Sequence, residues 1–307
     1  DSKKALGISF FTALLFAIHP VQVETVCWIS ASKIVLSTFF YLSALICYIQ
    51  YMRNSKWQYL LASVVSSILA MGCKEQSVII VPCLLLFDWM LFKRNMRSLK
   101  VYIEKVYYLI PAIAIFIVTL VANKDTGEEI IGYTIVDRFI FLCYSVFKYL
   151  LISAIPFKLS YLYPFPFQVG EKIPMALWIY PFVILFIGYV IYLNRRKPLL
   201  VFCTLFFILH LLPVLHVIPL PRYVVVADRY LYIPYIAFAI GLSILSYHLY
   251  ERQRKWILYA GFLYCSYLCV YTASYAPAWK NSDTLKEHFK EVLKKRETNL
   301  SINHEKQ

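Results

Sequence analysis

Apolar residues along this chain fall into ten long runs that short polar segments separate. A helix that crosses a bilayer needs about 20 apolar residues, with a lower limit of about 17, and the runs come close to that length. The pattern therefore predicts an all-α, polytopic membrane protein. The ten runs are Ala5–Ile18, Ile34–Tyr51, Trp57–Cys73, Ser77–Phe92, Val106–Ala122, Phe139–Ile155, Ala176–Leu193, Pro198–Ile218, Tyr230–Tyr250 and Trp256–Tyr275.

The loops rich in Lys and Arg predict how the chain is oriented, because such loops stay on the cytoplasmic side. Simple alternation of ten crossings would divide these loops between the two faces, so we expect one run not to cross. Phe139–Ile155 is the best candidate, since Lys148 in its middle would cost about 2.5–3.5 kcal/mol in lipid. The prediction is nine spanning helices and one interfacial helix. The alternative is that Phe139–Ile155 crosses the membrane and that one basic loop lies on the non-cytoplasmic side. The basic loops are Arg53–Lys56, Lys93–Lys105, Asn194–Lys197 and Glu251–Lys255.

Composition excludes a soluble domain, because 61% of the 307 residues are hydrophobic and mean hydropathy is +0.63. The net charge of +14 is concentrated in the short loops, so we interpret it as a topology signal and expect no nucleic-acid partner. The eight cysteines show neither metal-ligand spacing nor a secreted-module pattern. We therefore assign no metal site and no disulfide framework.

The composition changes after Trp279, which predicts a membrane domain over residues 1–276 and a polar extracytoplasmic tail over 277–307. Thr284 and Glu287 have capping-box spacing, and the tail has one apolar stripe at helical spacing. Such an amphipathic helix needs a surface to bury against, either the membrane or a helical repeat that continues past the tail. Asn299 begins a glycosylation sequon on the same side. The stripe consists of Leu285, Phe289, Val292 and Leu293.

Four polar clusters lie on the predicted luminal face. They are His19–Glu24, Lys33, Lys74–Gln76 and Asp228–Tyr230. Each alone is typical of a helix cap or an interfacial anchor. Together, two carboxylates, several cations and a histidine on one membrane face suit a site that binds an anionic lipid headgroup and deprotonates a hydroxyl.

Two further features have a structural and a functional interpretation. Asp88 falls at the cytoplasmic end of its run, and we expect it to be structural. The aromatic and proline loop Tyr161–Pro166 suits either a sugar or acceptor groove or an interfacial aromatic belt.

Several short motifs occur in an order that resembles the transmembrane region of the O-mannosyltransferases that carry C-terminal tetratricopeptide repeats, and of their bacterial relatives. These proteins belong to the C-type glycosyltransferases. The resemblance covers essentially the whole chain, and the ordered set is more specific than any single motif. The motifs are His19–Ser30, Cys73–Gln76, Tyr163-Pro164, Ala227–Pro234 and Trp279–Ser282.

The resemblance implies a C-type glycosyltransferase-like fold and transfer of a sugar, mannose in the eukaryotic members, from a polyprenyl- or dolichyl-phosphate carrier to Ser or Thr of a protein acceptor. It implies membrane lipid as a partner, and location in the endoplasmic reticulum membrane of a eukaryote or the plasma (inner) membrane of a bacterium. It assigns the lipid phosphate to Arg229, Lys74 and Lys33. It assigns His19, Glu24 and Asp228 to the walls of the pocket. It assigns Glu75 to pairing with a cation, and Tyr163 to contact with the sugar or the lipid phosphate.

The sequence departs from the family pattern in two places. The family's acidic motif lies in a first luminal loop that this sequence does not contain, so we expect the chain to begin about two spans late and to stop where the repeats start. Ile34 follows Lys33 where relatives often carry an acid. Glu24 and Asp228 are accordingly the catalytic candidates in this chain, while the main base is expected outside it.

A non-catalytic membrane scaffold or assembly subunit is the alternative function, and the absent acidic loop favours it. A transporter ranks third, because the matching broken helices in two halves that it should show are not visible in the sequence.

Overall fold

The computed structural model describes residues 2–122, 132–160, 162–215, 224–252, 254–288 and 290. Within these ranges the chain is helical and contains no strand, only an isolated bridge between Tyr163 and Val226. The all-α prediction is confirmed. The α-helices are α1 (Ser2–Ile18), α2 (Val23–Cys27), α3 (Ser32–Asn54), α4 (Trp57–Cys73), α5 (Ile80–Met90), α6 (Leu99–Ala122), α8 (Ile135–Ala154), α9 (Ile179–Leu193), α10 (Pro198–Leu211), α11 (Pro234–Arg252) and α12 (Arg254–Tyr275). The 3-10 helices are η1 (Pro20–Gln22), η2 (Ile29–Ala31), η3 (Glu75–Ile79), η4 (Met175–Trp178), η5 (Asp228–Leu231) and η6 (Ala276–Trp279).

Helix length and hydropathy identify a membrane protein. Four described helices are long and apolar enough to cross a bilayer: Ile29–Asn54, Leu99–Ala122, Met175–Leu193 and Trp256–Trp279. A fifth results if Ser2–Ile18 and Pro20–Cys27, which meet at a bend of 55°, are one span. The expectation of roughly nine spans stays a prediction, because α5 has only 11 residues and α10 only 14, below the lower limit of about 17.

The predicted interfacial run forms α8, which is not among the described helices that meet the spanning criteria. It begins earlier than expected, because Thr134 and Asp137 cap it reciprocally: Thr134 N donates to Asp137 Oδ2 at 2.8 Å, and Asp137 N donates to Thr134 Oγ1 at 3.2 Å. Its location at the membrane interface stays a prediction.

The tail is described only as far as residue 290, with residue 289 excepted. Residues 282–288 are helical, and the N-cap is Asn281, whose Oδ1 accepts from Thr284 N at 2.8 Å. Thr284 Oγ1 in turn accepts from Asn281 N at 3.2 Å. The predicted Thr284–Glu287 box is therefore wrong by one turn, because Asn281 provides an earlier cap. The rest of the predicted apolar stripe and the sequon at Asn299 lie outside the described residues.

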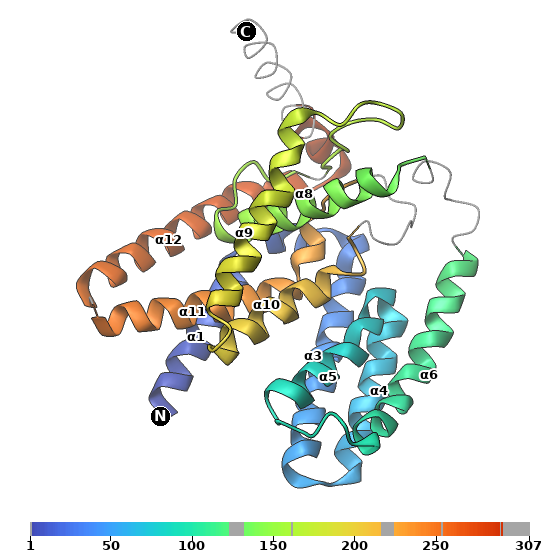
Figure 1. Ribbon diagram of the computed structural model, residues 1–307. Coiled ribbons are helices and arrows are strands. Elements are labelled where there is room, and N and C mark those ends of the chain that lie inside the picture. Colours follow the sequence, from blue (N-terminus) through green and yellow to red (C-terminus); the bar gives the residue numbers. More distant parts are fainter. Residues whose placement is uncertain are drawn as a thin grey trace, which may run out of the picture. The chain divides into compact units, whose positions relative to one another are not determined.

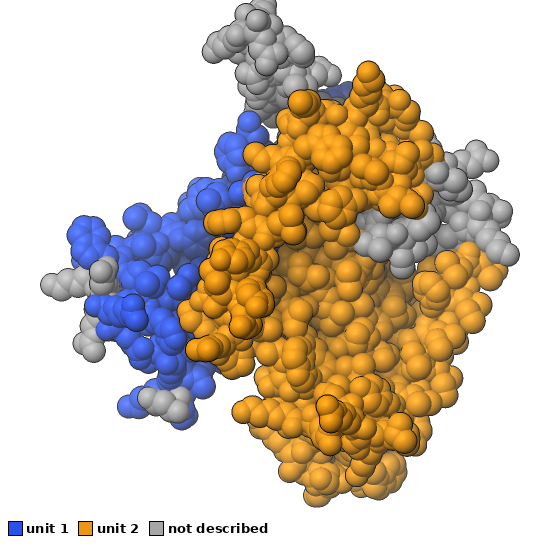
Figure 2. Space-filling model, in the orientation of Figure 1, with its two compact units in different colours: residues 1–31, 148–166, 223–307 blue, residues 32–147, 167–222 orange. Residues whose placement is uncertain are grey.

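The chain forms two compact units (Figure 2). Unit 1 comprises residues 1–31, 148–166 and 223–307, and unit 2 comprises residues 32–147 and 167–222. Each unit combines segments that are distant in the sequence.

In unit 1, α11 and α12 form an antiparallel hairpin and α1 packs along α11 (Figure 1). Thr12 Oγ1 on α1 donates to Ser243 Oγ on α11 at 3.1 Å, and Thr272 Oγ1 on α12 donates to the carbonyl of Ile18 at 2.7 Å. Tyrosines at helical spacing on α12 bind backbone groups of the segment after α8. Their contacts are Tyr264 with Ala154 O at 2.9 Å, Tyr267 with Pro156 O, and Tyr271 with Leu159 N at 3.0 Å.

In unit 2, α3 and α4 form the most extensive helix pair, and small polar residues allow their backbones to approach. Ser63 Oγ on α4 donates to the carbonyl of Ala44 on α3 at 2.7 Å, and Tyr108 OH on α6 donates to Ser63 Oγ at 2.8 Å. Ser37 Oγ donates to the carbonyl of Ala70 at 2.8 Å. These bonds fix α3, α4 and α6 against one another.

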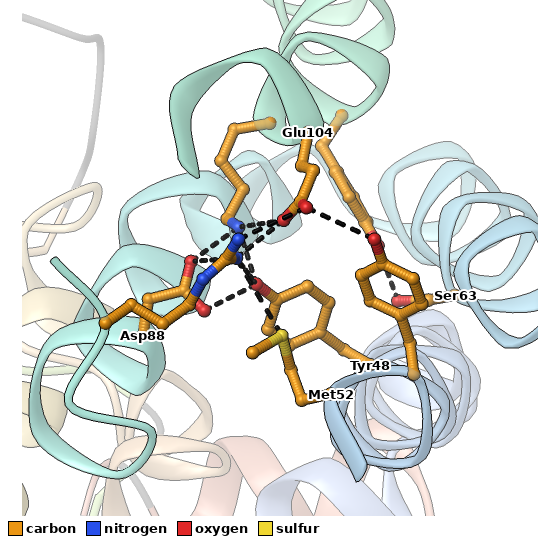
Figure 3. Close-up of polar contacts among 9 residues, drawn as sticks. Tyr48, Met52, Ser63, Asp88 and Glu104 are labelled. Atoms are coloured by element: carbon orange, nitrogen blue, oxygen red, sulfur yellow. Dashed lines mark hydrogen bonds and ion pairs between the residues drawn. The ribbon is translucent and has the colours of Figure 1, made fainter. Parts of the chain in front are cut away.

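A buried charge network connects α3, α5 and α6 in unit 2. Figure 3 shows Tyr48, Asp88 and Glu104 directed toward one another. The Asp88 carboxylate is fully buried and accepts from Tyr48 OH and from Lys105 Nζ, both at 2.6 Å. Arg94 Nη1 donates to Glu104 Oε2 at 2.6 Å and lies 3.4 Å from Asp88 Oδ2. Two carboxylates thus balance two cations, which supports the structural role expected for Asp88.

Replacing Lys105 with Met should destabilise the protein, because the Asp88 carboxylate would lose a partner at a site without solvent. Breaking such a buried pair costs about 3–5 kcal/mol, and Arg94 nearby should hold the loss near the lower value. Thermal unfolding in detergent measures the effect. Lys100→Met, an exposed lysine on the same helix, is the matched control, and equal melting temperatures for the two variants would contradict the prediction.

Candidate functional site

An ion pair between Glu24 and Arg229 is the centre of unit 1. Glu24 Oε1 accepts from Arg229 Nη1 at 2.5 Å, and Glu24 Oε2 accepts from the backbone N of Arg229 at 2.9 Å. The Glu24 side chain is fully buried, whereas the Arg229 side chain keeps 20% of its surface exposed. The carboxylate therefore fixes both the backbone and the guanidinium of a cation that a ligand can reach.

Local sequence explains how the two residues meet. Pro20 lacks an amide hydrogen and cannot continue α1, so the chain turns through η1 into the short α2 that carries Glu24. Asp228 opens η5, which packs against η1 and α2. Residues 205 positions apart are thereby joined.

Asp228 is fully buried beside this pair and has one described hydrogen-bond partner. Tyr163 OH donates to Asp228 Oδ1 at 2.9 Å. Val225 N donates to the Tyr163 carbonyl at 3.0 Å and so fixes the backbone at Tyr163. In the same segment, Ala227 N donates to Tyr149 OH on α8 at 3.3 Å. Tyr163, predicted only from the aromatic loop, is thus aligned with the segment that precedes Asp228.

Burial and neighbouring charge set the ionisation of these groups. Desolvation raises the pKa of Asp228 well above its ordinary value of 3.8, and the Glu24 carboxylate raises it further. Desolvation alone would lower the pKa of Arg229, but the Glu24 charge outweighs it and the pKa is raised. The Arg229 guanidinium therefore balances the Glu24 carboxylate, while burial beside Glu24 favours the neutral form of Asp228.

Aromatic rings flank the guanidinium, a feature that the sequence analysis did not assign to the site. The Arg229 Cζ lies 5.1 Å from the ring centroid of Tyr230 and 5.5 Å from that of Trp28. The Trp28 ring lies 6.0 Å from that of Trp279. Trp28 and Trp279 belong to two of the motifs that carry the family resemblance, so a signal for them was present in the sequence.

Several buried polar atoms near the ion pair make no hydrogen bond within the described part of the chain. They are Asp228 Oδ2, Thr25 Oγ1, and Gln22 Oε1 and Nε2. Buried polar atoms in native proteins almost always have a partner. Their accumulation next to Glu24 leaves hydrogen-bonding capacity beside the ion pair.

His19 lies at the end of α1, as the sequence suggested, and packs beside the ion pair's segment. It is fully buried, its ring lies 4.3 Å from that of Tyr235, and its Nδ1 accepts from Val21 N at 3.3 Å. No hydrogen bond described here joins it to Glu24, Asp228 or Arg229. His19 is thus the N-cap of η1, which follows α1.

Three further predicted residues lie in unit 2. Lys74 Nζ donates to Glu75 Oε1 at 2.5 Å, and Lys33 is exposed. Burial would raise the pKa of Glu75, but the charges of Lys74 and Lys33 outweigh this effect and lower it. The structure therefore groups Lys33, Lys74 and Glu75 in one unit, and Glu24, Tyr163, Asp228 and Arg229 in the other.

No group of three or more His, Cys, Asp or Glu side chains is placed to hold a metal ion within the described ranges. Tyr161, in the predicted aromatic and proline loop, lies outside those ranges. Comparisons with models of known families, with curated proteins and with solved structures found no match.

The raised pKa of Asp228 predicts a pH dependence of stability. Above its ordinary pKa of 3.8 the unfolded state loses a proton that the folded state keeps, so this residue's contribution to stability falls as pH rises. Asp228→Asn should flatten the fall in melting temperature as pH rises above about 4. Asp283→Asn, at an exposed position, is the control, and an unchanged slope in Asp228→Asn would contradict the assignment.

Proposed function

We propose that the chain is the membrane domain of a C-type glycosyltransferase, which transfers a sugar from a polyprenyl-phosphate carrier to a hydroxyl on the extracytoplasmic side. Mannose, and Ser or Thr of a protein, are the sugar and acceptor that the family resemblance favours. The observation that carries the proposal is the partly exposed Arg229, fixed by a buried carboxylate and flanked by aromatic rings.

This geometry supports binding of a phosphate. A guanidinium forms strong, charge-assisted hydrogen bonds to phosphate oxygens, and Glu24 orients Arg229 before a ligand arrives. The unpartnered atoms of Gln22, Thr25 and Asp228 add polar groups at the same place. Aromatic faces beside the cation suit an amphipathic ligand such as a sugar ring.

The proposed reaction is a single displacement with inversion. The acceptor oxygen forms a bond to the anomeric carbon as the bond from that carbon to the phosphate oxygen breaks. The lipid phosphate leaves with the electron pair, and a carboxylate base takes the acceptor's proton. Arg229 stabilises the charge that develops on the leaving phosphate.

The two catalytic candidates differ in what they can do. The raised pKa of Asp228 favours its protonated form, which is a poor general base, and Glu24 is paired with Arg229. The proposal therefore gives both residues a positioning role and assigns the base to neither. Lys33 and Lys74 are further candidates for phosphate contact.

Binding of the lipid-linked sugar tests the proposal without requiring turnover. Dolichyl-phosphate mannose should raise the melting temperature of the detergent-purified chain, since a ligand that binds only the folded state stabilises it. Arg229→Ala should weaken the apparent affinity about tenfold or more, because a hydrogen bond to a charged group contributes about 1.5–3 kcal/mol.

Two controls separate phosphate recognition from general damage. Arg195→Ala removes another guanidinium that lies on a tyrosine ring, at an exposed position, and should bind like the unsubstituted chain. Dolichol without phosphate should give no shift. Absence of any shift with dolichyl-phosphate mannose would overturn the proposal.

A non-catalytic scaffold is the second candidate, and a specific observation favours it. Glu24 and Asp228 are both fully buried, and Glu24 already pairs with Arg229, as in an ion pair that only holds segments together. In that case Arg229→Ala lowers the melting temperature while dolichyl-phosphate mannose changes nothing.

A further inference from the structure

An apolar groove lies within unit 1, between α1, α11 and α12. Its volume is about 610 Å³, within the usual range for sites that bind small molecules. The wall consists mainly of apolar side chains and small residues, which leave room between the helices. Representative lining residues are Gly7, Phe11, Ser243, Tyr247, Gly261 and Cys265.

Two glycines in the wall of the groove border open space. A Cβ atom placed on Gly7 or on Gly261 would meet no atom within 4 Å, so neither glycine is needed for close packing of the backbone. Phe262, which also lines the groove, is 71% exposed. The groove therefore opens onto the surface of the helix bundle, where lipid chains are the surrounding solvent.

One end of the groove is basic. Lys4 Nζ lies 4.6 Å from the ring centroid of Tyr247, a lining residue, and Lys4 forms no ion pair within the described part of the chain. Arg252, exposed at the end of α11, adds a second cation at this end. Glu251 lies there too, 4.0 Å from His248.

The location agrees with the predicted topology. The groove is lined by the N-terminal halves of α1 and α12 and the C-terminal half of α11. That end carries a basic loop assigned to the cytoplasmic side, whose leaflet is rich in anionic lipids. The Glu24–Arg229 pair lies beyond the opposite ends of α1 and α11.

We propose that this groove binds one acyl chain of an anionic glycerophospholipid, with the lipid phosphate held by Lys4. An apolar channel with a cation at its rim is complementary to an amphiphile with an anionic head. Lipids of the surrounding bilayer do not require a cation at this position. The Lys4 charge therefore distinguishes a lipid bound in the groove from bulk lipid. The site is separate from the proposed transferase site and does not depend on that function.

Native mass spectrometry of the detergent-purified chain tests this proposal. One retained phospholipid per chain is expected, and added palmitoyl-oleoyl phosphatidylglycerol should bind in preference to the matching phosphatidylcholine. Lys4→Gln should reduce that preference about fivefold, since one cation near the membrane surface contributes on this order. Lys3→Gln, at an exposed position without a described contact to the groove, should keep the preference.

Filling the groove gives an independent readout. Gly261→Phe should reduce retained lipid at least about tenfold, because a fully buried aromatic side chain would occupy the acyl chain's place. Gly241→Phe is the matched control: Gly241 lies on α11, has no atom within 4 Å of an added Cβ, and does not line the groove. If Gly261→Phe does not give a monodisperse protein, Gly7→Phe fills the groove from α1.

Three results would overturn the proposal. Equal binding of phosphatidylglycerol and phosphatidylcholine would remove the role of Lys4. Undiminished lipid in the variant that fills the groove would place the lipid elsewhere. A dimer that this variant dissociates would make a second copy of the chain the occupant.

Discussion

The desolvation of Glu24 is the constraint on which unit 1 depends. A carboxylate with no exposed surface is costly unless a cation and hydrogen-bond donors compensate it, and Arg229 supplies both through its guanidinium and its backbone N–H. That requirement fixes the segment that follows α1 against the start of η5. The position of Asp228 then follows, because it is the first residue of η5, and Tyr163 is held there by its hydrogen bond to Asp228.

Unit 2 also contains a fully buried carboxylate, Asp88, but its charge is compensated differently. Around Asp88, every charge has an opposite charge within hydrogen-bonding distance, and the network of Tyr48, Arg94, Glu104 and Lys105 is largely enclosed. Around Glu24, by contrast, the cation is partly exposed and adjacent polar atoms lack described partners. The first arrangement stabilises a fold, whereas the second suits recognition of a ligand.

Sequence periodicity was sufficient to predict ten helical runs, and each contains a helix in the structure. Their ends were harder to predict. Lys74–Gln76 interrupts the chain with η3, which leaves α5 only 11 residues, and Asn281 caps the tail helix before the predicted Thr284. Such boundaries depend on single capping and turn residues rather than on hydrophobic periodicity.

The sequence predicted which residues belong to the candidate site but not which of them form pairs. Charged side chains are costly at membrane depth, so Glu24, Asp228 and Arg229 could be selected from the sequence as site candidates. Tertiary contacts decide which carboxylate pairs with the Arg229 guanidinium, and no local sequence pattern predicts those contacts. His19 illustrates the limit: its position at a helix end was evident, but packing against Tyr235 makes it a cap. Lys105 and Glu104 were counted with the loop Lys93–Lys105, because the sequence does not show that Asp88 on α5 and Arg94 before α6 are their partners.

A double-mutant cycle on Glu24 and Arg229 tests the central claim most directly. Unfolding of the unsubstituted chain, Glu24→Gln, Arg229→Met and the double variant would be compared in one detergent. If the buried pair organises unit 1, the coupling free energy should exceed about 1 kcal/mol. The double variant should then lose less unfolding free energy than the sum of the losses in the two single variants. Additivity within about 0.5 kcal/mol would show that the two residues do not depend on each other, and would contradict the account.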